Sequence, residues 1–110
     1  MELTRLFYVS TAAFATTDSD AAAIAERSGD RNKIDEITGA MAFNGVNFAQ
    51  VLEGPTEKVY ALLERIKQDQ RHSGLIVVSE QKVRSRKYDD WIMDFASGTS
   101  FDGLLDAMHT

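Results

Sequence analysis

Residues 36–55, EITGAMAFNGVNFAQVLEGP, contain the signals that decide the fold. At their centre, Asn44-Gly45 is the dipeptide that most favours a tight hairpin turn, because both residues tolerate a positive φ. Residues 36–43 and 46–53 on either side are therefore predicted to form two antiparallel strands. Gly54 ends the second strand, and Pro55 suits the first turn of a helix, where a missing N–H costs nothing. A hairpin that leads directly into a helix is expected.

The segments outside this hairpin predict six further elements. Residues 3–10 (LTRLFYVS) are rich in aromatic and β-branched residues and predict a first strand. Asp18 or Ser19 can cap a helix that runs to about residue 30. The helix that begins at Pro55 carries an apolar face at helical spacing and extends to about residue 70. Residues 75–83 and 91–96 predict two more strands, and residues 101–108 an amphipathic helix.

The resulting order, β-α-β-β-α-β-β, predicts the fold class. It is an α+β, ferredoxin-like arrangement, with a mixed five-stranded sheet, two helices on one face and a short C-terminal helix. Right-handed crossovers place the first strand in the interior of the sheet. The C-terminal helix either covers the open face of the sheet or forms a dimer contact, and its spacing does not distinguish the two.

Composition excludes several classes of function. A chain of 110 residues is expected to form one core, and without cysteine it has no disulfide, thiolate metal site or cysteine nucleophile. The net charge of −5 disfavours nucleic acid, and the basic run at residues 82–87 is expected to be a solvated edge. No apolar stretch approaches the ~20 residues of a membrane span, so a cytoplasmic protein without membrane contact is expected.

Five segments in register resemble the BLUF family of flavin-binding blue-light sensors. They are RLFYVS at 5–10, Asn32 before ITG at 37–39, FAQVLEG at 48–54, RIKQDQRH at 65–72 and WIM at 91–93. The resemblance covers about residues 4–95 and implies a sensory domain over 1–97, with 98–110 as a C-terminal cap. It departs at Val46, where the family has glycine, so the hairpin is expected to differ in shape.

The resemblance implies that a noncovalent flavin lies between the two helices. Tyr8 matches the photoactive tyrosine, Gln50 the glutamine that bridges it to the flavin, and Asn32 the asparagine at the pyrimidine edge. In the family mechanism, light draws an electron and a proton from the tyrosine through the glutamine. The amide then rotates or tautomerises and strengthens a hydrogen bond to the flavin C4 carbonyl. An amide suits this role because it offers both donors and acceptors.

Further roles follow from the same resemblance. Ile24 and Ile37 would flank the ring, and Arg31 would reach a phosphate. Trp91 and Met93 match the mobile pair that relays the signal along the last strand. The remaining flavin contacts would come from the end of the second helix, at Arg65, Asp69, Arg71 and His72.

The expected cofactor is FAD, with FMN and riboflavin as alternatives, and no metal is expected. The predicted protein is not an enzyme but a homo-oligomeric sensor that acts on a partner or effector protein.

Two other classes of protein share this size and topology. A ferredoxin-like acyl-phosphate hydrolase needs a phosphate-binding loop with an arginine after the first strand. Residues 10–20, STAAFATTDSD, contain neither arginine nor glycine, which argues against it. A light-insensitive ligand- or protein-interaction module on the same fold remains the alternative, and the colour of the purified protein distinguishes it from a flavoprotein.

Overall fold

The computed structural model describes residues 2–87 and 95–97. Their elements, in chain order, are β1 (Leu3–Ala12), α1 (Asp18–Ile34), β2 (Thr38–Phe43), β3 (Asn47–Pro55), α2 (Thr56–Lys67), β4 (His72–Val83) and β5 (Phe95–Ser97). Residues 98–110 and most of the predicted last strand, including Trp91 and Met93, lie outside the described residues. The predicted C-terminal helix is therefore not tested.

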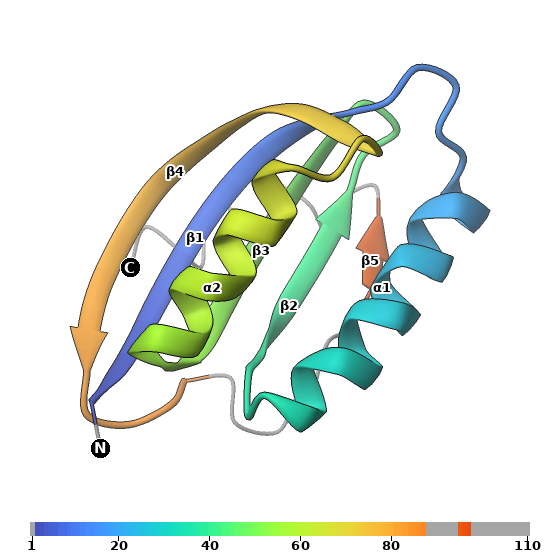
Figure 1. The fold of residues 1–110 in the computed structure, drawn as a ribbon. Coiled ribbons are helices and arrows are strands. Elements are labelled where there is room, and N and C mark those ends of the chain that lie inside the picture. The colour runs from blue at the N-terminus through green and yellow to red at the C-terminus, as the bar shows by residue number, and fades with distance from the viewer. Residues whose placement is uncertain (1, 88–94, 98–110) are drawn as a thin grey trace.

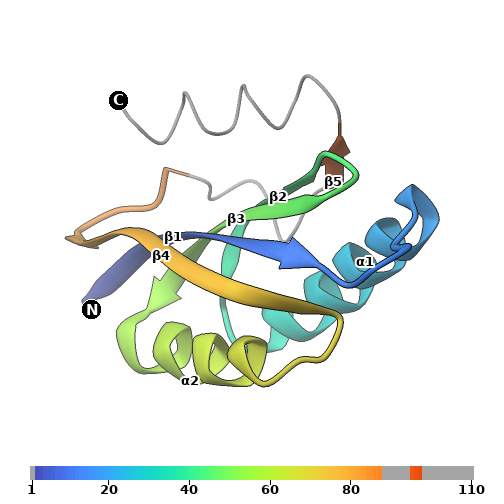
Figure 2. The same ribbon diagram turned by 90° about the horizontal axis from the view of Figure 1, so that it is seen from above.

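The sheet has the order β4-β1-β3-β2-β5. Its four long strands pair antiparallel, and the three-residue β5 adds parallel to β2 at the edge. As predicted, β1 lies in the interior, between β4 and β3. Both helices lie on the same face of the sheet (Figures 1 and 2). The predicted α+β, ferredoxin-like class with two helices is confirmed.

The β2–β3 hairpin forms where the sequence predicts it. Asn44 Oδ1 accepts hydrogen bonds from the N–H groups of Val46 (3.0 Å) and Asn47 (2.7 Å), and Gly45 has a φ of 95°. At the other end of β2, a Cβ on Gly39 would lie 1.9 Å from the Val51 carbonyl oxygen. Only glycine therefore allows the two strands to approach this closely.

The predicted helix ends were wrong by a few residues. Thr17, not Asp18 or Ser19, caps α1, because its hydroxyl accepts the Asp20 N–H and the Asp20 carboxylate accepts the Thr17 N–H in return. The helix continues past residue 30 to Ile34. Asn32 is consequently inside α1 and does not end it. Pro55 is the cap of α2, which ends at Lys67 and not near residue 70.

Two apolar clusters lie on the helical side of the sheet. One cluster joins α2 to β1 and β3, and comprises Leu6, Tyr8, Ile37, Leu52, Val59, Leu62 and Leu63. The other, Ala21, Met41, Phe43 and Phe48, lies between α1 and the β2–β3 hairpin. Each helix thus packs on its own part of the sheet. No helix among the described residues is long and apolar enough to cross a membrane.

The basic run at residues 82–87 is only partly the solvated edge that was expected. Lys82 and Arg84 are exposed. The guanidinium of Arg86, by contrast, donates to the Thr38 hydroxyl and to the main-chain carbonyls of Glu53 and Glu36, at 2.6–2.8 Å. The expectation was wrong for Arg86 because a hydroxyl and two main-chain carbonyls at the end of β3 and before β2 lie close enough to accept from its guanidinium.

Candidate functional site

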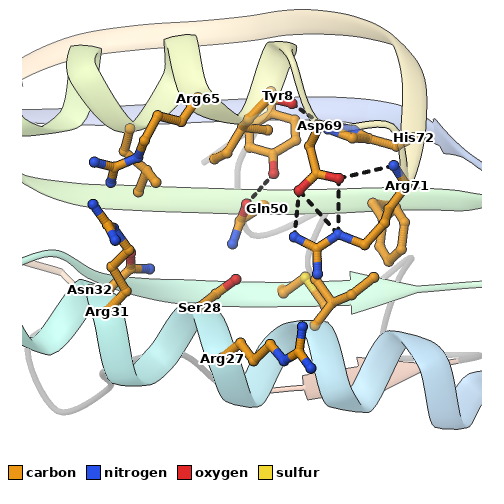
Figure 3. Close-up of a pocket in the computed structure, with 15 residues that line it drawn as sticks. Tyr8, Arg27, Ser28, Arg31, Asn32, Gln50, Arg65, Asp69, Arg71 and His72 are labelled. Atoms are coloured by element: carbon orange, nitrogen blue, oxygen red, sulfur yellow. Dashed lines mark hydrogen bonds and ion pairs between the residues drawn. The ribbon is translucent and has the colours of Figure 1, made fainter.

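A cavity of about 210 Å³ lies between α1 and α2, with β1 and β3 forming part of its wall. Figure 3 shows polar side chains entering it from both helices, the sheet and the turn before β4. The lining residues are Tyr8, Ile24, Arg27, Ser28, Arg31, Asn32, Met41, Phe48, Gln50, Leu62, Arg65, Ile66, Asp69, Arg71 and His72. Because each helix covers a different apolar cluster, a cavity remains between them.

Tyr8 and Gln50 form a buried pair at the sheet wall of this cavity. They are direct cross-strand partners in the β1–β3 register, which places both side chains on the helical face. The Tyr8 hydroxyl donates a hydrogen bond to Gln50 Oε1 (Figure 3). Tyr8 is 4% and Gln50 3% exposed. Burial, and to a lesser extent the charge of Asp69, raises the pKa of Tyr8 above its ordinary value.

Asn32 is the polar group of the cavity that most needs a ligand. It lies near the C-terminal end of α1 and is 1% exposed. Neither its Oδ1 nor its Nδ2 has a hydrogen-bond partner among the residues that the structure describes. A buried amide left without partners costs ~1–3 kcal/mol for each unsatisfied group. A ligand edge that carries a donor next to an acceptor would satisfy both atoms.

The turn between α2 and β4 closes one end of the cavity with charged groups. The Arg71 guanidinium binds both oxygens of Asp69, with Nε at 2.9 and 3.0 Å. This hydrogen bonding lowers the pKa of Asp69 to about 2. His72 Nε2 lies 2.6 Å from the Ile66 carbonyl oxygen, so it carries the proton and donates. The other ring nitrogen is then left for a different partner.

The structure brings together most of the side chains predicted for the site. Nine of them line the cavity: Tyr8, Ile24, Arg31, Asn32, Gln50, Arg65, Asp69, Arg71 and His72. Ile37 does not line it. This side chain is fully buried in the cluster under α2, because Gly54 leaves room for it against β3. The predicted relay residues, Trp91 and Met93, lie outside the described residues.

Six lining residues were not predicted, although several carry a signal in the sequence. Arg27 precedes Arg31 by one helical turn, and Ser28 precedes Asn32 by the same spacing. Phe48 lies two residues before Gln50 and so faces the same side of β3. Met41 is the cross-strand partner of Gln50 on β2. Leu62 and Ile66 belong to the apolar face of α2 that helical spacing predicts, and part of this face lines the cavity.

The fold and the cavity define a small α+β domain built to hold a ligand between two helices. Comparison with known families identifies the family of this domain. The model of the BLUF family, described as sensors of blue-light using FAD, matches residues 3–94. The chain belongs to the BLUF family. Its members are sensor modules that bind flavin, and this family assignment confirms the resemblance seen in the sequence.

Curated relatives are light-regulated proteins that are much longer than this chain. Photoactivated adenylate cyclase subunit alpha of Euglena gracilis is 34% identical over 98 residues, which is 89% of this chain and 10% of that protein. The blue light- and temperature-regulated antirepressor BluF of Escherichia coli is 40% identical over 58 residues, 53% of this chain and 14% of that one. The chain thus spans about a tenth of the length of the cyclase subunit.

Solved structures share the fold closely. The dark state of BlrB, a BLUF protein, has a TM-score of 0.85 and 31% identity, and the match covers 97% of this chain and 81% of that one. The photo-activated state of BlsA has a TM-score of 0.82 and 27% identity, covering 98% and 79%. A bacterial light-regulated adenylyl cyclase matches 97% of this chain with 34% of its own length, at a TM-score of 0.85 and 25% identity.

Proposed function

We propose that this chain senses blue light through a flavin held noncovalently between α1 and α2, with the Tyr8–Gln50 pair as its switch. The observation that carries the proposal is the buried hydrogen bond between these two side chains at the wall of the cavity. In the same cavity, the Asn32 amide, which has no hydrogen-bond partner among the described residues, supplies the polar group that would orient the ligand. One strand pair and one helix thus bring the three side chains to a single cavity.

The residues of the cavity fit a flavin. The pyrimidine edge of its ring carries an N–H next to a carbonyl, which is the donor–acceptor set that matches the two Asn32 atoms left without partners in the described part of the chain. Ile24, Leu62 and Ile66 supply apolar contacts from the two helices. Four arginines also line the cavity (Arg27, Arg31, Arg65 and Arg71), and guanidinium groups favour phosphate. This supports FAD, which the family description names, or FMN over riboflavin.

Tyr8 and Gln50 have the chemistry that a light-driven switch needs. A bound flavin supplies the absorption of blue light and a strongly oxidising excited state. Tyr8 would be the donor of both the electron and the proton that this excited flavin takes up. Gln50 would relay the proton, because its Oε1 already accepts the Tyr8 hydroxyl in a hydrogen bond. Once electron and proton had returned to Tyr8, a Gln50 amide left rotated or tautomerised would have its donor and acceptor atoms reversed and would keep the signal.

The output of this switch would be a change in a partner or effector protein, and not turnover of a substrate. The named relatives include photoactivated cyclases and an antirepressor, which are light-regulated proteins with different outputs. We infer that Trp91 and Met93 relay the change in Gln50 to that partner, through the chain that enters β5. A homo-oligomeric state and a cytoplasmic location stay predictions.

Two substitutions test the switch directly. Tyr8→Phe and Gln50→Leu should retain flavin but abolish the light-induced red shift, since each keeps much of the side-chain volume and removes one polar link. Absorption spectra before and during blue illumination measure the shift. Tyr60→Phe and Gln81→Leu make similar changes on exposed residues and should leave it intact. A normal red shift in Tyr8→Phe would show that Tyr8 is not the donor.

A further inference from the structure

Glu53 is a buried carboxylate that the proposed switch does not use. It follows Gln50 by three residues on β3, so its side chain points to the face of the sheet opposite the helices. The carboxylate is 0% exposed, and its Oε2 lies 2.8 Å from Nε of Arg5 on the neighbouring strand. Both of its oxygens also accept the main-chain N–H of Lys87, at 3.0 Å each. The buried Glu53 carboxylate therefore binds the main chain at Lys87, shortly after the end of β4.

Arg86 holds the same point of the chain from the other side. Its Nη1 donates to the Thr38 hydroxyl at 2.7 Å and to the Glu53 carbonyl at 2.8 Å. Its Nη2 donates to the Glu36 carbonyl at 2.6 Å. Arg86 and Lys87 are therefore bound to the end of β3 and the start of β2 through a planar guanidinium and a carboxylate, whose hydrogen bonds are directional.

This point of attachment precedes the proposed relay. Residues 88–94, which carry Trp91 and Met93 in the sequence, connect Lys87 to β5. At the far end of this connection, Phe95 of β5 pairs with Met41, and Met41 is the cross-strand partner of Gln50. The chain that carries the relay is thus tied at its start to β3 and to the start of β2, and at its end to β2, the neighbour of the Gln50 strand.

We propose that Glu53 and Arg86 act as positioning residues that fix the start of the relay segment and so set the lifetime of the light state. This inference rests on the proposed function. The side chains that respond to the change in Gln50 need a main chain that is fixed relative to Gln50. Glu53 lies on the same strand as Gln50, so it can provide this fixed point. If the anchor is weakened, the main chain at Arg86 and Lys87 is held less firmly relative to Gln50. Thermal return to the dark state should then be faster.

Glu53→Gln tests the anchor with little change in size. The substitution would leave the Arg5 charge without its anionic partner, while Tyr8, Gln50 and the cavity are untouched. We expect flavin binding and the red shift to persist and dark recovery to become about tenfold faster, the effect of losing roughly one charged hydrogen bond. Trp91 is the only tryptophan, so its fluorescence reports on the relay segment. Its light-induced change should be smaller than in the wild type.

A second variant covers the case in which Glu53→Gln fails to fold. Arg86→Lys keeps the charge, but an ammonium group cannot reach three acceptors in one plane, so recovery should again accelerate. Glu80→Gln and Arg84→Lys make the same chemical changes at exposed positions close by, and should recover at the wild-type rate.

The outcomes separate this inference from the proposed function. A wild-type protein without flavin or without a red shift overturns both. If the wild type switches, but Glu53→Gln and Arg86→Lys recover within about twofold of it and show the same Trp91 fluorescence change, only the anchor is overturned. An accelerated recovery with an intact red shift supports it, because a general loss of packing would also lower flavin retention.

Discussion

At the scale of single residues, the clearest consequence concerns Asn32, whose buried amide lacks a partner in the described part of the chain. Its cost to the flavin-free protein should disappear in Asn32→Leu, because an apolar group of similar size needs no hydrogen bonds. We expect the free energy of unfolding of the flavin-free variant to exceed that of the wild type by about 1 kcal/mol or more. The variant should nevertheless bind flavin ten- to a hundredfold more weakly, roughly the value of one or two hydrogen bonds. Thermal melts and flavin titration measure the two effects.

Ser10 provides the matched control for Asn32. Its hydroxyl is also buried and has no hydrogen-bond partner among the described residues, but it does not line the cavity. Ser10→Ala should therefore stabilise the flavin-free protein by ~1 kcal/mol without changing flavin affinity. If Asn32→Leu bound flavin as tightly as the wild type, Asn32 would not be a flavin contact.

Tyr8 makes stability depend on pH in the alkaline range. Its pKa is raised in the folded protein, mainly by burial, whereas the unfolded chain ionises near the ordinary value of 10.0. The unfolded state therefore loses its proton first. The free energy of unfolding should be unaffected below about pH 10 and should fall above it, by up to about 1.4 kcal/mol per pH unit for this group.

Denaturant titrations of the flavin-free protein between pH 8 and about 11 would measure this dependence. In Tyr8→Phe this part of the decrease should be absent. Tyr60→Phe, at a partly exposed position, should keep it. An identical pH profile in wild type and Tyr8→Phe would contradict the assignment of the effect to Tyr8.

At the scale of elements, Gly39 controls how closely β2 and β3 approach. A methyl group there would lie 1.9 Å from the Val51 carbonyl oxygen, a main-chain atom that cannot move aside cheaply. Gly39→Ala should therefore cost about 3 kcal/mol or more, or prevent folding. At Gly45, a Cβ meets nothing within 4 Å, and only its φ of 95° is unfavourable. Gly45→Ala should cost ~1–2 kcal/mol. Equal unfolding free energies for the two variants would contradict this account.

The elements were predictable from the sequence to the extent that their signals are local. Asn44-Gly45 located the hairpin because the turn depends only on its own residues. The start of α1 was misplaced because Thr17 and Asp20 cap the helix reciprocally, while Asp18 and Ser19 between them are equally good caps on composition. The end of α1 was predicted near residue 30, but packing of α1 on the sheet carries the helix on to Ile34.

At the scale of the whole molecule, the site depends on the order of the strands. Tyr8 and Gln50 are 42 residues apart in sequence and become cross-strand partners only because β1 lies beside β3. That these two residues and Asn32 line one cavity was predictable from the family resemblance, and the roles given to them stay predictions.

The positions of Ile37 and Arg86 could not be predicted from the sequence. Ile37 faces the core because of a space left by Gly54, and Arg86 finds its acceptors on two other strands. Both positions follow from tertiary contacts that leave no pattern in the local sequence.

The most direct test of the central claim is the visible absorption spectrum of the purified protein before, during and after blue illumination. We predict a structured flavin band that shifts slightly to the red in light and returns in the dark. Retention of that band without a shift, or with bleaching, would contradict the Tyr8–Gln50 switch while leaving flavin binding intact. A protein that binds no flavin, even after reconstitution, would contradict the whole account and favour a light-insensitive interaction module.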